Sequence, residues 1–239
     1  MTVLMQNTKI MICGGRSPRI GGNLMDYKDI LIDAGKRMLN KGLTVETWGN
    51  ISVRDPQSGL IYLTPSAMPY DSIGRDDVVV MRGDGSVAEG RRKPTVEAGM
   101  HLGIYRARTD VFAVIHTHPV DSTVFGVLHM PIPPIVDEAA QTIGGAVNVT
   151  DYALPGTREL AQNVVKTLGK SAACLIANHG AVCVGHDIDE AFKVCTVLEM
   201  TAKIYRMALS VGRPSVISDE NVVSLRDFME HHYGQDKQP

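Results

Sequence analysis

The sequence is poor in features that mark several classes of protein. It has one tryptophan, and its 24 Lys and Arg side chains nearly balance 26 Asp and Glu, for a net charge of -2. This balance provides no basic surface for nucleic acid. No stretch reaches the roughly 18 consecutive apolar residues of a membrane-spanning helix, and Gly14 to Arg16 interrupt the N-terminal apolar run, unlike a signal peptide. We therefore expect a cytoplasmic protein that binds neither nucleic acid nor membrane.

Cysteine is also scarce, and its spacing excludes two kinds of site. The four cysteines contain no Cys-x-x-Cys pair, and three of them fall in segments with the pattern of core strands or helices. Buried free thiols are the expected state of such residues. They are Cys13, Cys174, Cys183 and Cys195. A disulfide framework and a cysteine-based structural zinc site are both disfavoured.

The chain is long enough, at 239 residues with 44% hydrophobic residues, to bury one large core. Residues 1–25 are glycine-rich and show little periodicity, so we predict an N-terminal arm followed by one domain over 26–239. Apolar residues at helical spacing predict four helices, the first ended by Lys41-Gly42 and the third opened by Asp187 as N-cap. The predicted helices cover 26–40, about 97–107, 188–209 and about 219–231.

Short apolar runs predict the strands. Several pieces separated by turn residues lie between Val45 and Val80, and two further runs end close to histidines. The best strands are 61–63, 78–81, 111–115 and 172–176. No Gly-x-Gly-x-x-Gly follows a strand, which argues against a dinucleotide-binding fold. We predict a single α/β domain with a mixed, mainly antiparallel central sheet flanked by helices.

Three histidines form a candidate metal site. His116 and His118 are two residues apart at the end of a strand, so in an extended chain both side chains project from one face. His179 follows the other apolar run, beside Gly180, which lets the backbone turn close to a site. Three imidazoles with an open position are typical of catalytic zinc. A lone histidine at a strand end is more often structural, and this alternative applies to each residue taken singly.

Five short motifs follow one another along the chain: Thr47 to Ser52, Thr64-Pro65-Ser66, Glu97 with His101, Ile115 to His118, and Asn178-His179-Gly180. In this order they resemble the class II aldolase/adducin family, over roughly residues 26–235. The resemblance implies that His116, His118 and His179 bind one Zn2+ per subunit, with Mn2+ and Co2+ as alternatives. The remaining histidines lack such motif support and are predicted to be packing or surface residues: His101, His129, His186, His231 and His232.

The resemblance also gives Glu97 a role. A carboxylate at a helix start is ordinarily a surface residue favoured by the helix dipole. In the aldolases of the family, however, a glutamate at this position approaches the metal and acts as acid and base, whereas the 4-epimerases have an aspartate. Glu97 therefore favours cleavage of a carbon–carbon bond through a metal-stabilised enediolate, without a catalytic lysine.

A phosphate pocket is implied at residues that match the family pattern only in part. The matching positions are Asn50, Ser66, Ala67, Thr95 and Val96. The sugar-phosphate aldolases have glycine at position 67 and serines at 95 and 96, and Val96 has no side-chain donor. Backbone N–H groups in turns still suit an anion, so phosphate is the preferred anchor, with a carboxylate or an unphosphorylated group as the alternative.

Two further positions concern the proton donor to the aldehyde. The family aldolases have a tyrosine in the segment that matches Val136 to Glu138, where this chain offers Asp137 and Glu138 instead. A second family tyrosine, which reaches into a neighbouring subunit's site, matches Tyr233. On its position alone, Tyr233 would be a residue of a frayed tail. The resemblance implies active sites at subunit interfaces and a homotetramer.

The leading hypothesis is a class II, metal-dependent aldehyde-lyase. It would cleave a ketose 1-phosphate similar to L-fuculose 1-phosphate into dihydroxyacetone phosphate and an aldehyde. A sugar-phosphate epimerase, a dehydratase and a sugar-acid decarboxylase use the same fold and metal, and remain alternatives. A non-catalytic scaffold like the adducin head is a further alternative, which would need no metal and ignore chelators.

Overall fold

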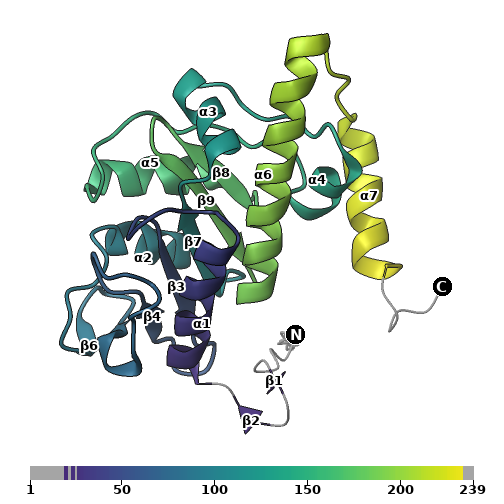
Figure 1. Ribbon diagram of the computed structural model, residues 1–239. Coiled ribbons are helices and arrows are strands. Elements are labelled where there is room, and N and C mark those ends of the chain that lie inside the picture. The colour runs from purple at the N-terminus through teal and green to yellow at the C-terminus, as the bar shows by residue number, and fades with distance from the viewer. Residues whose placement is uncertain (1–18, 21–22, 25, 234–239) are drawn as a thin grey trace, which may run out of the picture.

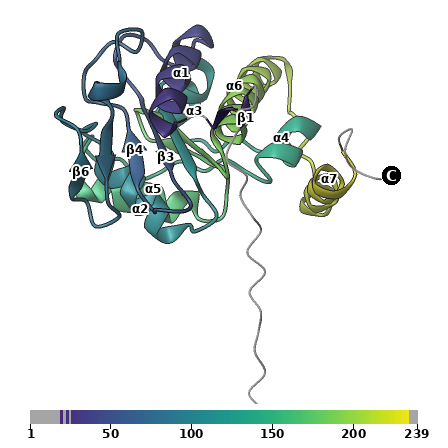
Figure 2. The ribbon, with the colours of Figure 1, turned by 90° about the horizontal axis from the view of Figure 1, so that it is seen from below.

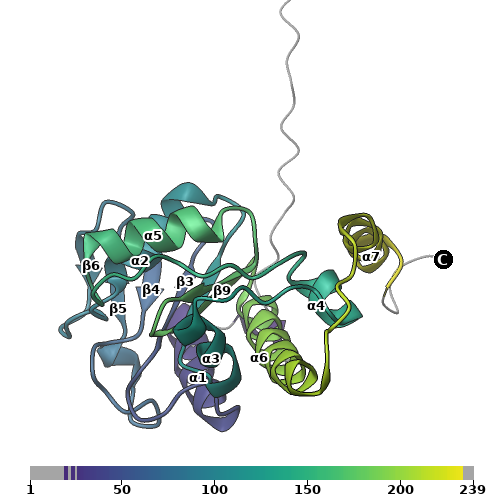
Figure 3. The ribbon, with the colours of Figure 1, turned by 90° about the horizontal axis from the view of Figure 1, so that it is seen from above.

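The computed structural model describes residues 19–20, 23–24 and 26–233. Over these residues the chain forms three layers, with a central sheet between two layers of helices, as Figure 1, Figure 2 and Figure 3 show from three sides. The sheet has seven strands, and every neighbouring pair is antiparallel. The predicted fold class is confirmed.

The strand order places the longest-range pairings at the centre of the sheet. β3 lies beside β7, and β7 beside β9, so segments more than 60 residues apart in sequence are hydrogen-bonded neighbours. The order across the sheet is β6 (Val87–Glu89), β5 (Val79–Met81), β4 (Ile61–Leu63), β3 (Asn50–Arg54), β7 (Ala113–Thr117), β9 (Gly180–Gly185) and β8 (Ala173–Ile176).

Helices cover both faces of the sheet, and alternate strand residues point into the two cores. In β7, Ile115 packs in one apolar cluster and Val114 in the other, as the two-residue period of a strand requires. The first cluster lies under α1 (Tyr27–Asn40), α3 (Val120–Leu128) and α6 (Ile188–Val211). The second lies under α2 (Ala98–Ala107) and α5 (Arg158–Leu168), on the opposite face in Figure 3.

Two helices lie outside this sandwich. α4 (Asp137–Thr142) and α7 (Asp219–His231) pack on each other beyond α6, at the right of Figure 1. Val222 is the one buried residue of α7, so this helix has little contact with the domain core. The remaining described elements are η1 (Arg75–Asp77) and the short antiparallel pair β1 (Arg19–Ile20) and β2 (Asn23–Leu24).

The sequence patterns located most of these elements. The four predicted helices are α1, α2, α6 and α7, and the Asp187 carboxylate caps α6 by accepting from the Glu190 N–H at 2.8 Å. The elements that were not predicted are α3, α4, α5, η1, β1, β2, β6 and β9. Cys174, Cys183 and Cys195 are free and buried, as expected, while Cys13 lies outside the described residues. No helix in the described part of the chain is long and apolar enough to cross a membrane.

Candidate active site and metal centre

Several chain segments meet at one edge of the sheet. β7 ends there while its antiparallel neighbours β3 and β9 begin there, so Asn50 pairs with His116 and Ala181 pairs with Thr117. Glu97 is the N-cap residue of α2 at the same place. The antiparallel sheet thus brings residues from four distant parts of the sequence to one site.

The three predicted histidine ligands converge at this edge. One ligand atom from each of His116, His118 and His179 lies within 4.8 Å of the others, and the ring centroids are 4.7 to 4.8 Å apart. His116 lies in β7, while His118 lies just beyond its end and reaches back, with its Nε2 atom 2.9 Å from the Nε2 of His116. His179 lies in the turn between β8 and β9.

Two glycines allow the backbone to come this close. A Cβ atom on Gly180 would lie 2.2 Å from the carbonyl oxygen of Thr117, a clash that excludes every other residue without movement of the backbone. Gly49 has a φ of +74° and lies directly behind the His116 carbonyl, which is 2.7 Å from the position of a Cβ. Both glycines are therefore part of the geometry that gathers the imidazoles.

The donor set fits a divalent metal ion. The Nδ1–H of His116 donates to the carbonyl oxygen of Ala181 at 2.9 Å, which leaves the Nε2 lone pair facing the other rings, as in metal-binding histidines. Burial, together with the neighbouring imidazoles, lowers the pKa of His118 to about 3 and that of His179 to about 4. Neutral imidazole is the form that binds a metal.

Glu97 completes the cluster from the helix side. Its Oε2 atom lies 3.1 Å from the Nε2 of His116, and its Oε1 atom lies 3.9 Å from the Nε2 of His179. Oε1 is buried and has no hydrogen-bond partner, an arrangement that suits a carboxylate meant to face a cation or a proton. Burial raises the pKa of Glu97, but the His116 ring and the Asn50 amide outweigh it, so the pKa lies below its ordinary value.

The family model described as Class II Aldolase and Adducin N-terminal domain matches residues 29–206 of this chain. The chain belongs to the class II aldolase and adducin family. Its fold, its motif order and the three-histidine site agree with this assignment. Class II aldolases are metal-dependent aldehyde-lyases, and the chain is an enzyme of this type.

Individual relatives agree over most of their length. The chain is 34% identical over 212 residues to a 5-deoxy-D-ribulose 1-phosphate aldolase of Bacillus thuringiensis serovar kurstaki, covering 89% of this chain and 99% of that one. It is 34% identical over 218 residues to a 5-methylthioribulose-1-phosphate/5-deoxyribulose-1-phosphate aldolase of Rhodospirillum rubrum, covering 91% and 96%. A solved L-fuculose 1-phosphate aldolase superposes with a TM-score of 0.83 at 37% identity, covering 85% and 96%.

Of the five residues matched to the family's phosphate pocket, Asn50 lies in β3 and the other four lie on two adjoining loops beside the metal site. These loops are joined because the Ser66 N–H donates to the Lys93 carbonyl at 3.0 Å and the Thr95 N–H donates to the Thr64 carbonyl at 3.3 Å. Ala67 adopts a positive φ of 55°, a conformation that favours the glycine of the family pattern. Val96 is 67% exposed.

Asn50 has a contact that the sequence did not suggest. Its side chain is buried, its Nδ2 donates to Glu97 Oε2 at 2.9 Å, and its Oδ1 lies 2.6 Å from the Nε2 of His101. The amide therefore supports the glutamate directly. The amide nitrogen has a second N–H, so the predicted contact of Asn50 with a substrate phosphate stays a prediction.

The residues considered for the aldehyde proton lie elsewhere. Asp137 and Glu138 are exposed in the first turn of α4, and Tyr233 is 61% exposed just after α7. α4 and α7 lie beyond α6, away from the sheet edge that holds the histidines (Figure 1 and Figure 3). Within one chain these three side chains do not join the site.

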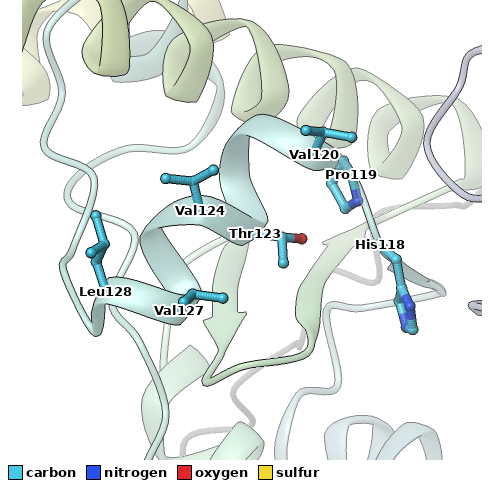
Figure 4. A pocket seen from close by; sticks show the side chains of 7 residues that line it. All are labelled: His118, Pro119, Val120, Thr123, Val124, Val127 and Leu128. Atoms are coloured by element: carbon cyan, nitrogen blue, oxygen red, sulfur yellow. The ribbon is translucent and has the colours of Figure 1, made fainter. Parts of the chain in front are cut away.

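Two features beside the metal ligands were missed. Trp48 is 57% exposed and its ring stacks on His118, with centroids 6.3 Å apart. His118 also lines a cavity of about 440 Å³ that lies along α3, as Figure 4 shows. Its lining is largely apolar, from Pro119, Val120, Thr123, Val124, Val127 and Leu128. The signal for Trp48 was its place within the Thr47 to Ser52 motif.

Proposed function

We propose that this protein is a metal-dependent aldolase that cleaves a ketose 1-phosphate to dihydroxyacetone phosphate and an aldehyde. The observation that carries the proposal is the placement of Glu97. A buried carboxylate with an unpartnered oxygen lies against three convergent imidazoles. Such a site holds a metal and a proton-transfer group within reach of the same substrate carbon.

His116, His118 and His179 would hold the ion, with Zn2+ as the first candidate and Mn2+ or Co2+ as the others, one per subunit. A divalent ion held there would draw electron density from the substrate carbonyl and so ease cleavage of the bond between C3 and C4. The lowered pKa values of His118 and His179 and the Ala181 carbonyl that orients His116 support this assignment.

Glu97 would move the proton at C3 of the substrate. Cleavage breaks the bond between C3 and C4, the C4 hydroxyl loses its proton as it becomes the aldehyde, and C3 gains one proton. Oε1 is the free oxygen of Glu97 and is the atom we assign to this transfer. The Asn50 N–H holds Oε2 meanwhile, so the carboxyl group stays oriented while Oε1 gains or loses its proton.

The substrate phosphate would bind at the joined loops of Ser66, Ala67, Thr95 and Val96. The Ser66 and Thr95 hydroxyls and the backbone N–H groups of Ala67 and Val96 are suitable donors, together with the second N–H of Asn50. The relatives' names indicate phosphorylated ketoses whose far end lacks a hydroxyl group. Trp48 and the apolar lining beside His118 suit such an end, and favour a 5-deoxy or similar ketose 1-phosphate.

Tyr233 of the partner subunit would complete the site in a homotetramer. Tyr233 lies exposed just after α7, and exposed apolar residues lie along α6 and α7. They include Met207, Val211, Val223 and Phe228, with exposed fractions between 47% and 90%. An apolar surface of this kind is typical of an oligomer interface. Asp137 and Glu138 lie on α4, which packs on α7, and are the alternative proton donors to Tyr233.

The test is release of dihydroxyacetone phosphate from a panel of ketose 1-phosphates by zinc- or manganese-loaded protein, with and without a chelator. Release that the chelator abolishes is the expected result, largest for ketoses with an apolar end. No release from protein shown to hold metal would contradict the proposal. That negative result would favour a dehydratase, an epimerase or a decarboxylase acting on a sugar acid, because Val96 lacks the hydroxyl donor of the family's phosphate pocket.

A further inference from the structure

A row of buried polar side chains runs behind Glu97, away from the open side of the site. Asn50 and Ser52 lie two residues apart on β3 and so share one face, and His101 and Tyr105 lie four apart on α2. All four are 5% exposed or less. We call these four residues the polar row. Asn50 is its member in contact with Glu97.

The hydrogen bonds of the polar row have one consistent direction. An ionised carboxylate only accepts, so Glu97 Oε2 requires the Nδ2 of Asn50 as donor, at 2.9 Å. The Oδ1 of Asn50 must then face a donor, and it lies 2.6 Å from the Nε2 of His101. The charge on Glu97 thereby selects the His101 tautomer that carries its proton on Nε2.

The other nitrogen of His101 is fixed in the same way. With the proton on Nε2, Nδ1 is an acceptor, and the Ser52 hydroxyl donates to it at 2.6 Å. The Tyr105 hydroxyl lies 2.8 Å from the Ser52 hydroxyl and 3.0 Å from the Ser52 carbonyl oxygen. It can donate to either of these two acceptors. Each hydrogen bond of the polar row therefore joins one donor to one acceptor, and all four side chains of the row are neutral.

We propose that His101 is a positioning residue that fixes, through the amide of Asn50, the orientation of the Glu97 carboxylate towards the metal site. The inference rests on the proposed function of Glu97 as the proton-transfer group. A neutral chain holds the carboxylate in place without adding a positive charge, and a lysine or arginine there would stabilise the ionised form and oppose proton uptake. A row of neutral donors is thus suited to an acid–base group.

A purely structural role is the alternative. Buried polar side chains must be hydrogen-bonded in any case, and His101 then affects stability alone. The positioning role and the structural role require different ring nitrogens of His101. Positioning of Glu97 needs the Nε2–H donor towards Asn50, whereas packing and the Ser52 contact depend on the ring as a whole.

Two substitutions of His101 test the contributions of its two ring nitrogens separately. The amide nitrogen of His101→Gln lies near the former Nε2 and can still donate to Asn50, while the shorter amide of His101→Asn reaches only the former Nδ1 and its Ser52 contact. We expect His101→Asn to lower kcat roughly 10- to 100-fold with little change in KM. His101→Gln should restore most of that loss. His186→Asn, on an exposed histidine paired with Glu190, is the matched control and should not change kcat.

Metal content and thermal unfolding of each variant are measured alongside. Equal kcat values for His101→Asn and His101→Gln, or losses that follow the melting temperature alone, would overturn the inference. Loss of kcat in the Asn variant at full metal content and a melting temperature equal to that of the Gln variant supports it.

A spectroscopic measurement decides the geometry without any turnover. In the metal-loaded protein labelled with 15N-histidine, the His101 signals are those absent from His101→Gln. They should show a proton on Nε2 and an unprotonated Nδ1. A proton on Nδ1 would overturn the inference even in an active enzyme. If no ketose 1-phosphate is cleaved but Nε2 carries the proton, the proposed function fails while the His101 to Glu97 arrangement stands.

Discussion

Two regions of the molecule differ in how completely their side chains are buried and hydrogen-bonded. We call them the metal edge, which is the end of the sheet that holds His116, His118 and His179, and the outer unit, which is α4 with α7. At the metal edge, His116 is fully buried, its ring nitrogens have defined neighbours, and the polar row behind Glu97 is matched link by link. In the outer unit, α7 has Val222 as its buried residue and exposes apolar side chains such as Val223 and Phe228.

The difference indicates which parts of the function a single chain can complete. The proposed ion binding and proton transfer need only side chains that packing and hydrogen bonds hold within one subunit. The proposed contact at the aldehyde end would need a second subunit, because Tyr233 lies exposed just after α7. The predictions below alter one region while the other serves as reference.

Removal of a predicted ligand should have the largest effect. His179→Ala takes away one of the three imidazoles, so we expect loss of stoichiometric metal and a fall in turnover of at least about 100-fold. Metal per chain after gel filtration and release of dihydroxyacetone phosphate are the measurements. The control is His186→Ala, an exposed histidine away from the site. Full metal content in the His179 variant would contradict the assignment.

A charge on the outer unit should break the assembly and leave the metal edge intact. Val223→Asp introduces an uncompensated charge on the apolar face of α7, at a cost on the order of 3 kcal/mol or more if that face is buried between subunits. We expect smaller particles by light scattering, full metal content and reduced turnover. Val87→Asp, on the edge strand β6, is the control. An unchanged tetramer would show that α7 is not at the interface.

The buried imidazole of His101 should make the metal edge sensitive to acid. Burial lowers the pKa of His101 from 6.5 to about 3, so below pH 6.5 the unfolded chain binds a proton that the folded chain rejects. This residue's contribution to stability is therefore present above pH 6.5 and is lost progressively as the pH falls from 6.5 towards 3. His101→Gln should unfold with a shallower pH dependence in urea titrations from pH 7 to 4. Parallel curves for both proteins would exclude this cause.

The smallest effect is expected at a helix cap of the outer unit. The Ser218 hydroxyl accepts from the Asn221 N–H at 3.3 Å at the start of α7. Ser218→Ala should cost about 1 kcal/mol, because one N–H of the first turn loses its partner. Hydrogen exchange should accelerate in α7 and not in β7. Acceleration in both would mean that the outer unit and the sheet unfold together.

Local signals were enough to predict the long helices and the ligands. α1 and α6 have apolar stripes and aspartate N-caps, and the metal ligands follow buried strands within recognisable motifs. Among the elements that were missed, α5 had a local signal that was not used, namely the Thr157 cap and Leu160, Val164 and Leu168 on one face, whereas most of the others are short. α4 has six residues, and β6 pairs with β5 across an irregular register, so neither has a strong period of its own.

The polar row was missed for a different reason. Ser52 and His101 are 49 residues apart, and only the strand and helix geometry brings them within 2.6 Å. The sequence did contain one signal of the polar row. Glu97, His101 and Tyr105 follow one another at four-residue spacing, which places them on one face of a helix. Without the side-chain hydrogen bonds between β3 and α2, that spacing indicates packing equally well.

The most direct test of the account is turnover and metal content of Glu97→Gln, measured on the same sample with the best ketose 1-phosphate. We predict that the variant keeps one metal ion per chain, because the three histidines remain, and loses roughly 100- to 10,000-fold in kcat. Undiminished turnover with bound metal would contradict the central claim, because proton transfer would then belong to a residue other than Glu97.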